Sequence, residues 1–414
     1  MEKKLYPLKF IPAASITPWG GNALTGRLAK RFVEVDEQGN ESVIGEDALV
    51  GESWEIADMG FQDSVVAEGW LAGNAISELM ETYLERIVGE TVYNFYGRQF
   101  PLLVKILDVK GKLPAQVHPD DDIAAQRYDA LGRAKLWYVM DADQDAKIYC
   151  GFTREVSAQE FFDRCNNGTV YEILNQITPK KGDVLYVTPG TVHAAEGGLL
   201  LAEVQESSDL TFTLCGQGFD QLAEAIDIID YRAFDFGLYK KGQLWGEEAS
   251  CCPCHTGECD HDHDHGPVET LVESPQFNVS KLHLSDPLHI YTDKFESFIV
   301  YICIEGAASI QVPATKESGE AYMETYELAK GETVLVPAEL PDFYLVPRDR
   351  STVILEAVTR PEEAFDEYID PNTEAFLENE DYEGLEDGVF DDDNDDDDDD
   401  FSSPSGASPL SFFS

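Results

Sequence analysis

Two short segments carry side chains that could hold a metal ion. Gln116 and His118 lie two residues apart in Gln-Val-His-Pro, and residues i and i+2 share one face of a β-strand. His193 comes much later, in Pro-Gly-Thr-Val-His-Ala. Two neutral imidazoles and an amide oxygen can form part of a divalent metal site, with zinc the usual ion. The sequence therefore predicts one zinc ion bound by Gln116, His118 and His193, unless both histidines simply bond neighbouring backbone groups.

A second group of metal-binding residue types is concentrated near the middle of the chain. It contains Cys251, Cys252, Cys254 and Cys259, followed by His-Asp-His-Asp-His at 261–265. Thiolates and imidazoles at this density bind zinc or copper, but the spacing matches no zinc-finger pattern. The segment also lacks large apolar residues, as a flexible polar connector would. Both interpretations stay open.

Most of the elements that must position these residues are expected to be strands. Residues 102–107, 184–187 and 199–204 are short apolar runs bounded by Gly, Pro or Asp. Their length and β-branched content are typical of buried strands.

Three helices are expected between the strands. Apolar residues from Ile76 to Ile87 recur at spacings of three and four ahead of Gly89, a residue suited to a helix C-cap. Ser157 to Glu160 has the pattern of a capping box, which predicts the start of a second helix. The third is expected from Gln221 to Ile229.

One sequence pattern occurs twice. Residues 181–189 read Lys-Gly-Asp-Val-Leu-Tyr-Val-Thr-Pro, and residues 330–337 read Lys-Gly-Glu-Thr-Val-Leu-Val-Pro. A glycine turn that feeds a strand ending at proline is typical of small antiparallel barrels. Two unrelated hairpins are the alternative. We favour a mainly β fold of two cupin (jelly-roll) barrels, with helical insertions in the first.

This pattern divides the chain into four parts. Residues 1–245 are expected to form the first barrel with its site, and 246–268 a linker rich in Cys, His and Asp. Residues 269–360 would form a smaller second barrel without metal ligands. The last part, 361–414, contains a block of nine aspartates and Asn394. Such a block repels itself, so we expect a disordered acidic tail, whose partner is unknown.

The charge balance limits the range of partners. The chain has 29 basic and 80 acidic side chains, a formal net charge of −51. Nucleic acid and anionic membranes attract basic surfaces, so we expect neither as a partner. The sequence shows no signal peptide, no apolar run long enough to cross a membrane and no disulfide framework among its eight cysteines. These features favour the cytoplasm.

Several longer motifs resemble those of the type I mannose-6-phosphate isomerases in their bacterial form. The resemblance covers residues 8 to about 214. It is carried by Pro-Trp-Gly-Gly (18–21), Gly-Glu-Ser-Trp-Glu (51–55), Phe-Pro-Leu-Leu-Val-Lys-Ile-Leu-Asp (100–108), the two histidine motifs, Glu-Val-Gln (203–205) and Ser-Asp (208–209).

The resemblance implies a zinc site that this chain has altered. The family binds zinc through the two motif histidines, which correspond to His118 and His193, and through a glutamate at the position of Lys135. An ammonium in place of a carboxylate opposes a dication: two unit charges about 4 Å apart interact by about 4 kcal/mol at an effective dielectric of about 20, and a +1/+2 pair by about twice that. Thr213 likewise stands where the family has an arginine. We therefore expect the zinc ion to be weakened or lost.

The activity that the resemblance implies is the interconversion of mannose 6-phosphate and fructose 6-phosphate through an enediol. Glu203 is the candidate catalytic base, or else a solvated or salt-bridged strand residue. Arg133 and Lys135 are the candidate ligands of the substrate phosphate, or else surface charges. Two alternatives stay open: a non-catalytic relative that binds sugar phosphates, and a structural or metal-sequestering protein in which the linker and tail are the active parts.

Overall fold

The computed structural model describes residues 3–35, 41–215, 219–234, 268–292, 295–316 and 318–361. The cysteines and histidines expected in the linker, and the acidic tail, lie outside these ranges. The described part is mainly β, as predicted.

The first half contains a pair of antiparallel sheets. One has six strands in the order β1-β4-β5-β12-β7-β10, and the other has five in the order β13-β6-β11-β8-β9. Their bounds are β1 Ala13–Gly21, β4 Val50–Ile56, β5 Leu102–Val109, β6 Lys112–Val117, β7 Lys135–Ala142, β8 Lys147–Phe152, β9 Leu174–Ile177, β10 Val184–Val187, β11 His193–Glu196, β12 Leu199–Glu206 and β13 Phe212–Thr213. A small hairpin joins β2 (Val33–Val35) to β3 (Glu41–Val43). The three runs predicted as strands are β5, β10 and β12.

The second half repeats this strand order. Its five-stranded sheet runs β14-β15-β22-β17-β20, and its four-stranded sheet runs β16-β21-β18-β19. The bounds are β14 Val268–Glu273, β15 Asn278–Leu284, β16 Leu288–Tyr291, β17 Ile299–Glu305, β18 Ala307–Thr315, β19 Ala321–Ala329, β20 Thr333–Val336, β21 Asp342–Pro347 and β22 Thr352–Val358. Strands β15 to β22 thus occupy the places of β5 to β12, and the repeated Lys-Gly-acid pattern leads into the equivalent edge strands β10 and β20.

Each pair of sheets encloses its own apolar core. Leu107, Trp137, Leu185 and Ala195 belong to the core between the two sheets of the first half. Tyr301, Ile310, Phe343 and Ile354 belong to that of the second half. The sheets are open, and the structure shows no closed barrel among the residues it describes. The finer description as two cupin barrels therefore stays a prediction.

Two of the three expected helices differ in extent from the prediction. Positive φ at Leu84 (49°) splits the first into α1 (Ile76–Tyr83) and α2 (Glu85–Val88), with Gly89 following at φ 92°. Ser157 caps α5 (Ala158–Asn166) as predicted, because its hydroxyl accepts the Glu160 N–H. The third helix, α6 (Phe219–Ala225), stops short of Ile229. The remaining helices are α3 (Glu90–Tyr96), α4 (Asp121–Tyr128) and the 3-10 turn η1 (Val170–Ile173).

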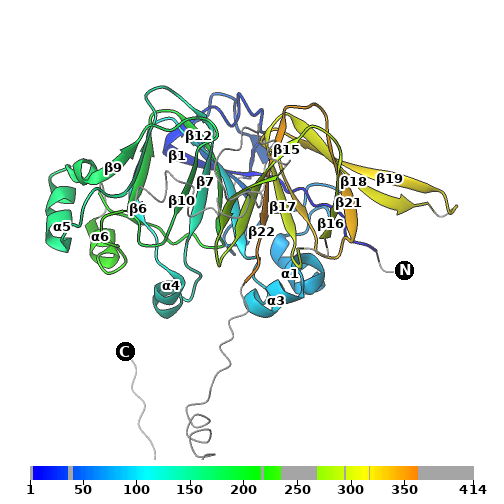
Figure 1. Ribbon diagram of the computed structural model, residues 1–414, viewed down its shortest axis with the longest axis horizontal. Helices are drawn as coiled ribbons and strands as arrows, with labels where there is room; N and C mark the ends of the chain where they lie inside the picture. Colours follow the sequence, from blue (N-terminus) through cyan, green and yellow to red (C-terminus); the bar gives the residue numbers. More distant parts are fainter. Residues whose placement is uncertain are drawn as a thin grey trace, which may run out of the picture. The chain divides into compact units, whose positions relative to one another are not determined.

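The first half of the chain also contributes to the surroundings of the second pair of sheets. Leu8 forms a β-bridge with Leu335, and α1 to α3, inserted between β4 and β5, lie at one end of the second pair (Figure 1). Phe100 meets Phe298 at 4.6 Å between ring centroids, and both side chains are fully buried. Residues 1–363 accordingly form one compact unit. The four-part division of the chain stays a prediction.

Two expectations from composition can be compared with the structure. Cys165 of α5 and Cys215 form a disulfide, whereas the sequence had indicated no disulfide framework. The two thiols come together because α5 packs beside the segment that follows β13. Among the described residues, no helix is both long and apolar enough to span a membrane.

Replacing Phe298 tests whether the two pairs of sheets share a core. Phe298→Ala should lower the free energy of unfolding by about 3–5 kcal/mol, because it removes a large buried ring and leaves a cavity. Urea unfolding measures the change. Phe162→Ala, on the 40% exposed Phe162 of α5, should change it by less than about 0.5 kcal/mol. A small effect at Phe298 would show that the two halves are stable independently.

Candidate functional site

The predicted site residues converge on the inner face of the six-stranded sheet. Glu203 on β12 pairs in register with Lys105 of β5 on one side and Trp137 of β7 on the other. Across the core, His193 of β11 pairs with Gln116 of β6. Because side chains alternate along a strand, these residues can face one another between the sheets.

The two histidines lie side by side at this end of the core. The His118 and His193 rings are 4.8 Å apart, and the Gln116 amide nitrogen lies 3.3 Å from His193 Nε2. Each Nδ1 lies 2.9 Å from a backbone carbonyl, that of Leu210 for His118 and that of Thr191 for His193. Both histidines thus bond neighbouring backbone groups through Nδ1, which was the alternative to metal binding. Each Nε2 faces the site. His118 Nε2 is buried and has no hydrogen-bond partner among the residues that the structure describes.

A chain of contacts connects the histidines to Glu203. The His193 ring lies 5.4 Å from Trp137, edge to face, and Trp137 Nε1 donates to Glu203 Oε2 at 2.6 Å. Lys135 Nζ forms an ion pair with the same carboxylate oxygen at 3.2 Å. Lys135 is 1% exposed and Glu203 2% exposed. The structure therefore brings the candidate base into direct contact with the residue that replaces the expected zinc ligand.

Two more basic side chains complete a cationic cluster. Arg133 Nη1 lies 3.2 Å from Asp209, and its Nε donates to Gln205 at 3.1 Å. Lys105 lies 3.3 Å from Glu52 and 3.4 Å from Asp209. Arg133 and Lys135 are buried, so neither is the surface charge that the sequence left open.

Burial and charge set the protonation states of the pair. Burial and then the Arg133 charge lower the pKa of Lys135 to about 7, although Glu203 opposes the change. Burial alone would raise the pKa of Glu203, but Lys135, Lys105, Arg133 and the Trp137 N–H outweigh it and lower the value to about 2. Glu203 is therefore a carboxylate at neutral pH.

The same charges keep the histidines neutral. Burial and then Lys135 lower the pKa of His193 to about 3. Burial, followed by Lys135 and Arg133, lowers the pKa of His118 well below its usual value. Since Nδ1 faces a carbonyl in each ring, the proton sits there and the lone pair is on Nε2.

These residues do not fit a zinc ion. The lone pair of His118 would suit a metal, but that of His193 faces the Gln116 amide, and Glu203 is engaged by Lys135 and Trp137. In the part of the chain that the structure describes, no three His, Cys, Asp or Glu residues are grouped so as to hold a metal ion. Structural and catalytic zinc sites use at least three protein ligands, with no cation among them. The assignment of Gln116, His118 and His193 as zinc ligands stays a prediction.

Glu52 and Glu55, the two described carboxylates of the family motif Gly-Glu-Ser-Trp-Glu, are engaged by other side chains. Glu52 accepts from the Trp54 indole at 2.8 Å and pairs with Lys105. Glu55 pairs with Lys30 at 2.8 Å. Thr213, at the position of the family arginine, pairs with Gln116 in the sheet and so lies beside the site.

The second pair of sheets contains a counterpart of Glu203 without the cations. Glu356 of β22 pairs in register with Tyr301 of β17, and the Tyr301 hydroxyl donates to its carboxylate at 2.8 Å. By the same registers, Ile299 occupies the place of Lys135 and Ser280 that of Lys105. The fold alone thus provides a buried carboxylate with an aromatic donor, and the cationic cluster belongs to the first half.

Four residues of the site were missed from the sequence. Trp137 bonds Glu203, Gln205 and Asp209 bond Arg133, and Lys105 pairs with Asp209. A signal was present for Lys105, because it interrupts an otherwise apolar strand and must find buried partners there.

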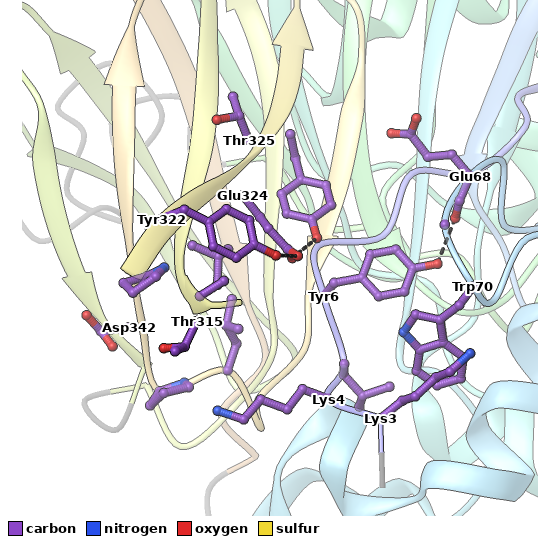
Figure 2. A pocket seen from close by; sticks show the side chains of 18 residues that line it. Lys3, Lys4, Tyr6, Glu68, Trp70, Thr315, Tyr322, Glu324, Thr325 and Asp342 are labelled. Carbon is purple, nitrogen blue, oxygen red and sulfur yellow. Dashed lines mark hydrogen bonds between the residues drawn. The ribbon is translucent and has the colours of Figure 1, made fainter. Parts of the chain in front are cut away.

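The structure also contains a cavity apart from this cluster. It measures about 850 Å³ and lies between the N-terminal segment and strands β18 and β19. Figure 2 shows its aromatic and charged lining, in which Tyr322 and Tyr326 donate to Glu324 and Tyr6 donates to the Glu68 carbonyl. None of its lining residues belongs to the cluster around Glu203.

The chain shares its fold with solved phosphomannose isomerases. A structure of mannose 6-phosphate isomerase from Bacillus subtilis superposes with a TM-score of 0.64 at 25% identity, over 85% of this chain and 99% of that one. A variant of phosphomannose isomerase from Salmonella typhimurium superposes with a TM-score of 0.62 at 15% identity, over 86% and 100%, which supports the fold alone.

Sequence similarity covers nearly the same length. Residues 8–150 match the model of the phosphomannose isomerase type I catalytic domain. Mannose-6-phosphate isomerase ManA from Bacillus subtilis is 31% identical over 345 residues, which are 82% of this chain and 95% of that protein. Mannose-6-phosphate isomerase from Streptococcus mutans is 28% identical over 331 residues, 77% and 88% of the two chains. The chain therefore belongs to the type I mannose-6-phosphate isomerase family.

The pH dependence of stability can test the pKa of one buried carboxyl beside the site. Glu206, at the end of β12, accepts the Ala134 N–H at 2.6 Å, and burial with the neighbouring Asp121 raises its pKa to about 8. A carboxyl whose pKa is higher in the folded than in the unfolded protein stabilises the fold at pH values below its unfolded-state pKa. This stabilisation is lost as the pH rises through the folded-state pKa. Glu206→Gln cannot ionise. Its free energy of unfolding relative to wild type should therefore rise by a few kcal/mol between about pH 5 and about pH 9, since one pKa unit is about 1.4 kcal/mol.

Urea unfolding at both pH values measures this difference. Glu155→Gln, on an exposed side chain, is the control and should show a constant difference from wild type. A constant difference for Glu206→Gln as well would show that this carboxyl is ionised in the folded protein.

Proposed function

We propose that the chain binds a hexose 6-phosphate at the cluster around Glu203 and interconverts its aldose and ketose forms, mannose 6-phosphate and fructose 6-phosphate. The gathering of one buried carboxylate, two neutral histidines and three cations on a single face carries this proposal. Membership of the isomerase family supports it. In the finer description of the fold, which we also propose, each pair of sheets is a cupin barrel and only the first has a site.

Arg133, Lys135 and Lys105 supply the positive charge that an anionic substrate requires. Arg133 offers a planar set of donors suited to a phosphate, and lysine offers a compact charge. The lone pair of His118 Nε2 has no partner in the protein, so it can accept a sugar hydroxyl. Loss of the family arginine at Thr213 removes one cation from this set and should weaken the interaction with an anionic substrate or intermediate.

Glu203 is the residue we assign to proton transfer. Its carboxylate removes the proton from C2 of the aldose, the C1 carbonyl oxygen takes up a proton, and an enediol results. Return of the carbon-bound proton to C1, with loss of the O2 proton, gives the ketose. The Lys135 ammonium stabilises the negative charge that develops on the sugar oxygen. Because Glu203 has a pKa of about 2 it is a weak base, and we expect slower turnover than in relatives with the usual site.

One observation favours a second candidate function, sugar-phosphate binding without turnover. Lys135 and Trp137 both donate to Glu203 Oε2, and Lys135, Lys105 and Arg133 lower the pKa of Glu203 to about 2, so uptake of a proton by this carboxylate is unfavourable. Stabilisation by fructose 6-phosphate in a thermal-shift titration, with no isomerisation at high protein concentration, would select this candidate.

Glu203→Gln tests the isomerase assignment. The variant keeps the shape of the side chain but cannot take a proton, so kcat for fructose 6-phosphate to mannose 6-phosphate should fall by about 10²–10⁴-fold with little change in KM. A coupled assay of the isomerisation measures both constants.

Glu356→Gln is the matched control. It makes the same change at the equivalent strand position of the second pair of sheets, and kcat should stay at the wild-type value. Equal loss in both variants would trace the effect to stability, and an active Glu203→Gln enzyme would remove Glu203 from proton transfer.

A further inference from the structure

We infer that the Lys135–Glu203 ion pair takes the place of a divalent metal in this pocket, so that the chain binds its sugar phosphate without zinc. The identity of the ligand rests on the proposed function. The exclusion of zinc rests on the geometry of the pocket.

The charges of the pocket are already balanced. Its cations are Lys105, Arg133 and Lys135, and its carboxylates are Glu52, Asp209 and Glu203, each within 3.4 Å of a partner of opposite sign. A divalent cation would leave two positive charges uncompensated in a buried site. Such an ion would also be repelled by the neighbouring ammonium and guanidinium groups.

The ligand groups are also engaged. Glu203 Oε2 could bind a metal only by leaving Lys135 and Trp137, and His193 Nε2 only by losing its contact with Gln116. Lys135 would then be a buried cation among Arg133 and Lys105 without its carboxylate, and breaking a buried pair in this way is strongly destabilising. Lys135 is therefore the residue that opposes a metal ion, through its charge and through its contact with Glu203.

The second pair of sheets shows that the fold does not require this lysine. Ile299 occupies the equivalent place, beside a buried carboxylate that is bonded to Tyr301. A buried lysine is unfavourable unless it is paired, and an apolar residue satisfies the same position in the other half. Lys135 therefore has a role in the pocket. An ammonium has three N–H groups, more than its contact with Glu203 uses, so it can also face the oxygens of a sugar.

Zinc content of the full-length protein tests the inference, after the linker has been removed as a source of ligands. In the background variant, Cys251, Cys252, Cys254 and Cys259 are serine, and the four linker histidines are asparagine (His255, His261, His263 and His265). After incubation with zinc and desalting, elemental analysis should find far less than one ion per chain. Thermal stabilisation by fructose 6-phosphate should be the same with and without EDTA.

Lys135→Glu on this background should restore a metal site. We expect about one zinc ion per chain and at least about 100-fold tighter zinc binding, because a cation becomes a carboxylate beside His118 and His193. Adding His193→Ala should abolish the gain. Lys180→Glu makes the same charge change at an exposed position and should bind no additional zinc.

Each outcome is decisive for the inference. One zinc ion per chain in the background variant, released by His118→Ala, would overturn it, as would loss of the fructose 6-phosphate stabilisation in EDTA. The zinc content of the unaltered pocket decides the matter even if Lys135→Glu fails to fold. Absence of isomerisation, with EDTA-insensitive ligand binding, would remove the proposed catalysis and leave this inference intact.

Discussion

The contact between Lys135 and Glu203 is the interaction on which the rest of the site depends. Each side chain is almost fully buried, and each would be costly in that position without the other. Lys135 helps to keep Glu203 ionised, burial together with Lys135 keeps both histidines neutral, and Glu203 accepts from Trp137, whose ring contacts His193. The site is thus organised by charges that the protein itself supplies.

The repeated strand order allows a comparison of the two halves, of which the first contains the cationic cluster and the second does not. Both halves place a carboxylate on the same central strand, opposite an aromatic donor on its neighbour. Around Glu203 the neighbouring positions hold Lys105 and Lys135, and around Glu356 they hold Ser280 and Ile299. Ser297 likewise occupies the place of Arg133, so three changes of residue type separate the cationic cluster from the uncharged surroundings of Glu356.

Much of the fold was predictable because its signals are local. The buried strands β5, β10 and β12 appear as apolar runs, and the start of α5 follows from the Ser157 cap. The break at Leu84 was not predictable, since the apolar spacing continues through it and packing on the second pair of sheets determines the chain direction there. Convergence of Gln116, His118 and His193 could be anticipated from motif spacing. The pairing of Lys135 with Glu203 could not, because it requires β12 to lie between β5 and β7, a register between distant segments.

The central position of β12 has a consequence for how the pocket is made. Strand β5 and strand β7 are synthesised long before the strand that joins them, and Leu8 must wait for Leu335 before its β-bridge can form. Contacts between such distant segments slow folding and leave sheet edges unpaired in the meantime. Lys105 and Lys135 accordingly remain without their shared neighbour until residues 199–206 have left the ribosome, so the pocket is among the last parts of the first half to acquire its native environment.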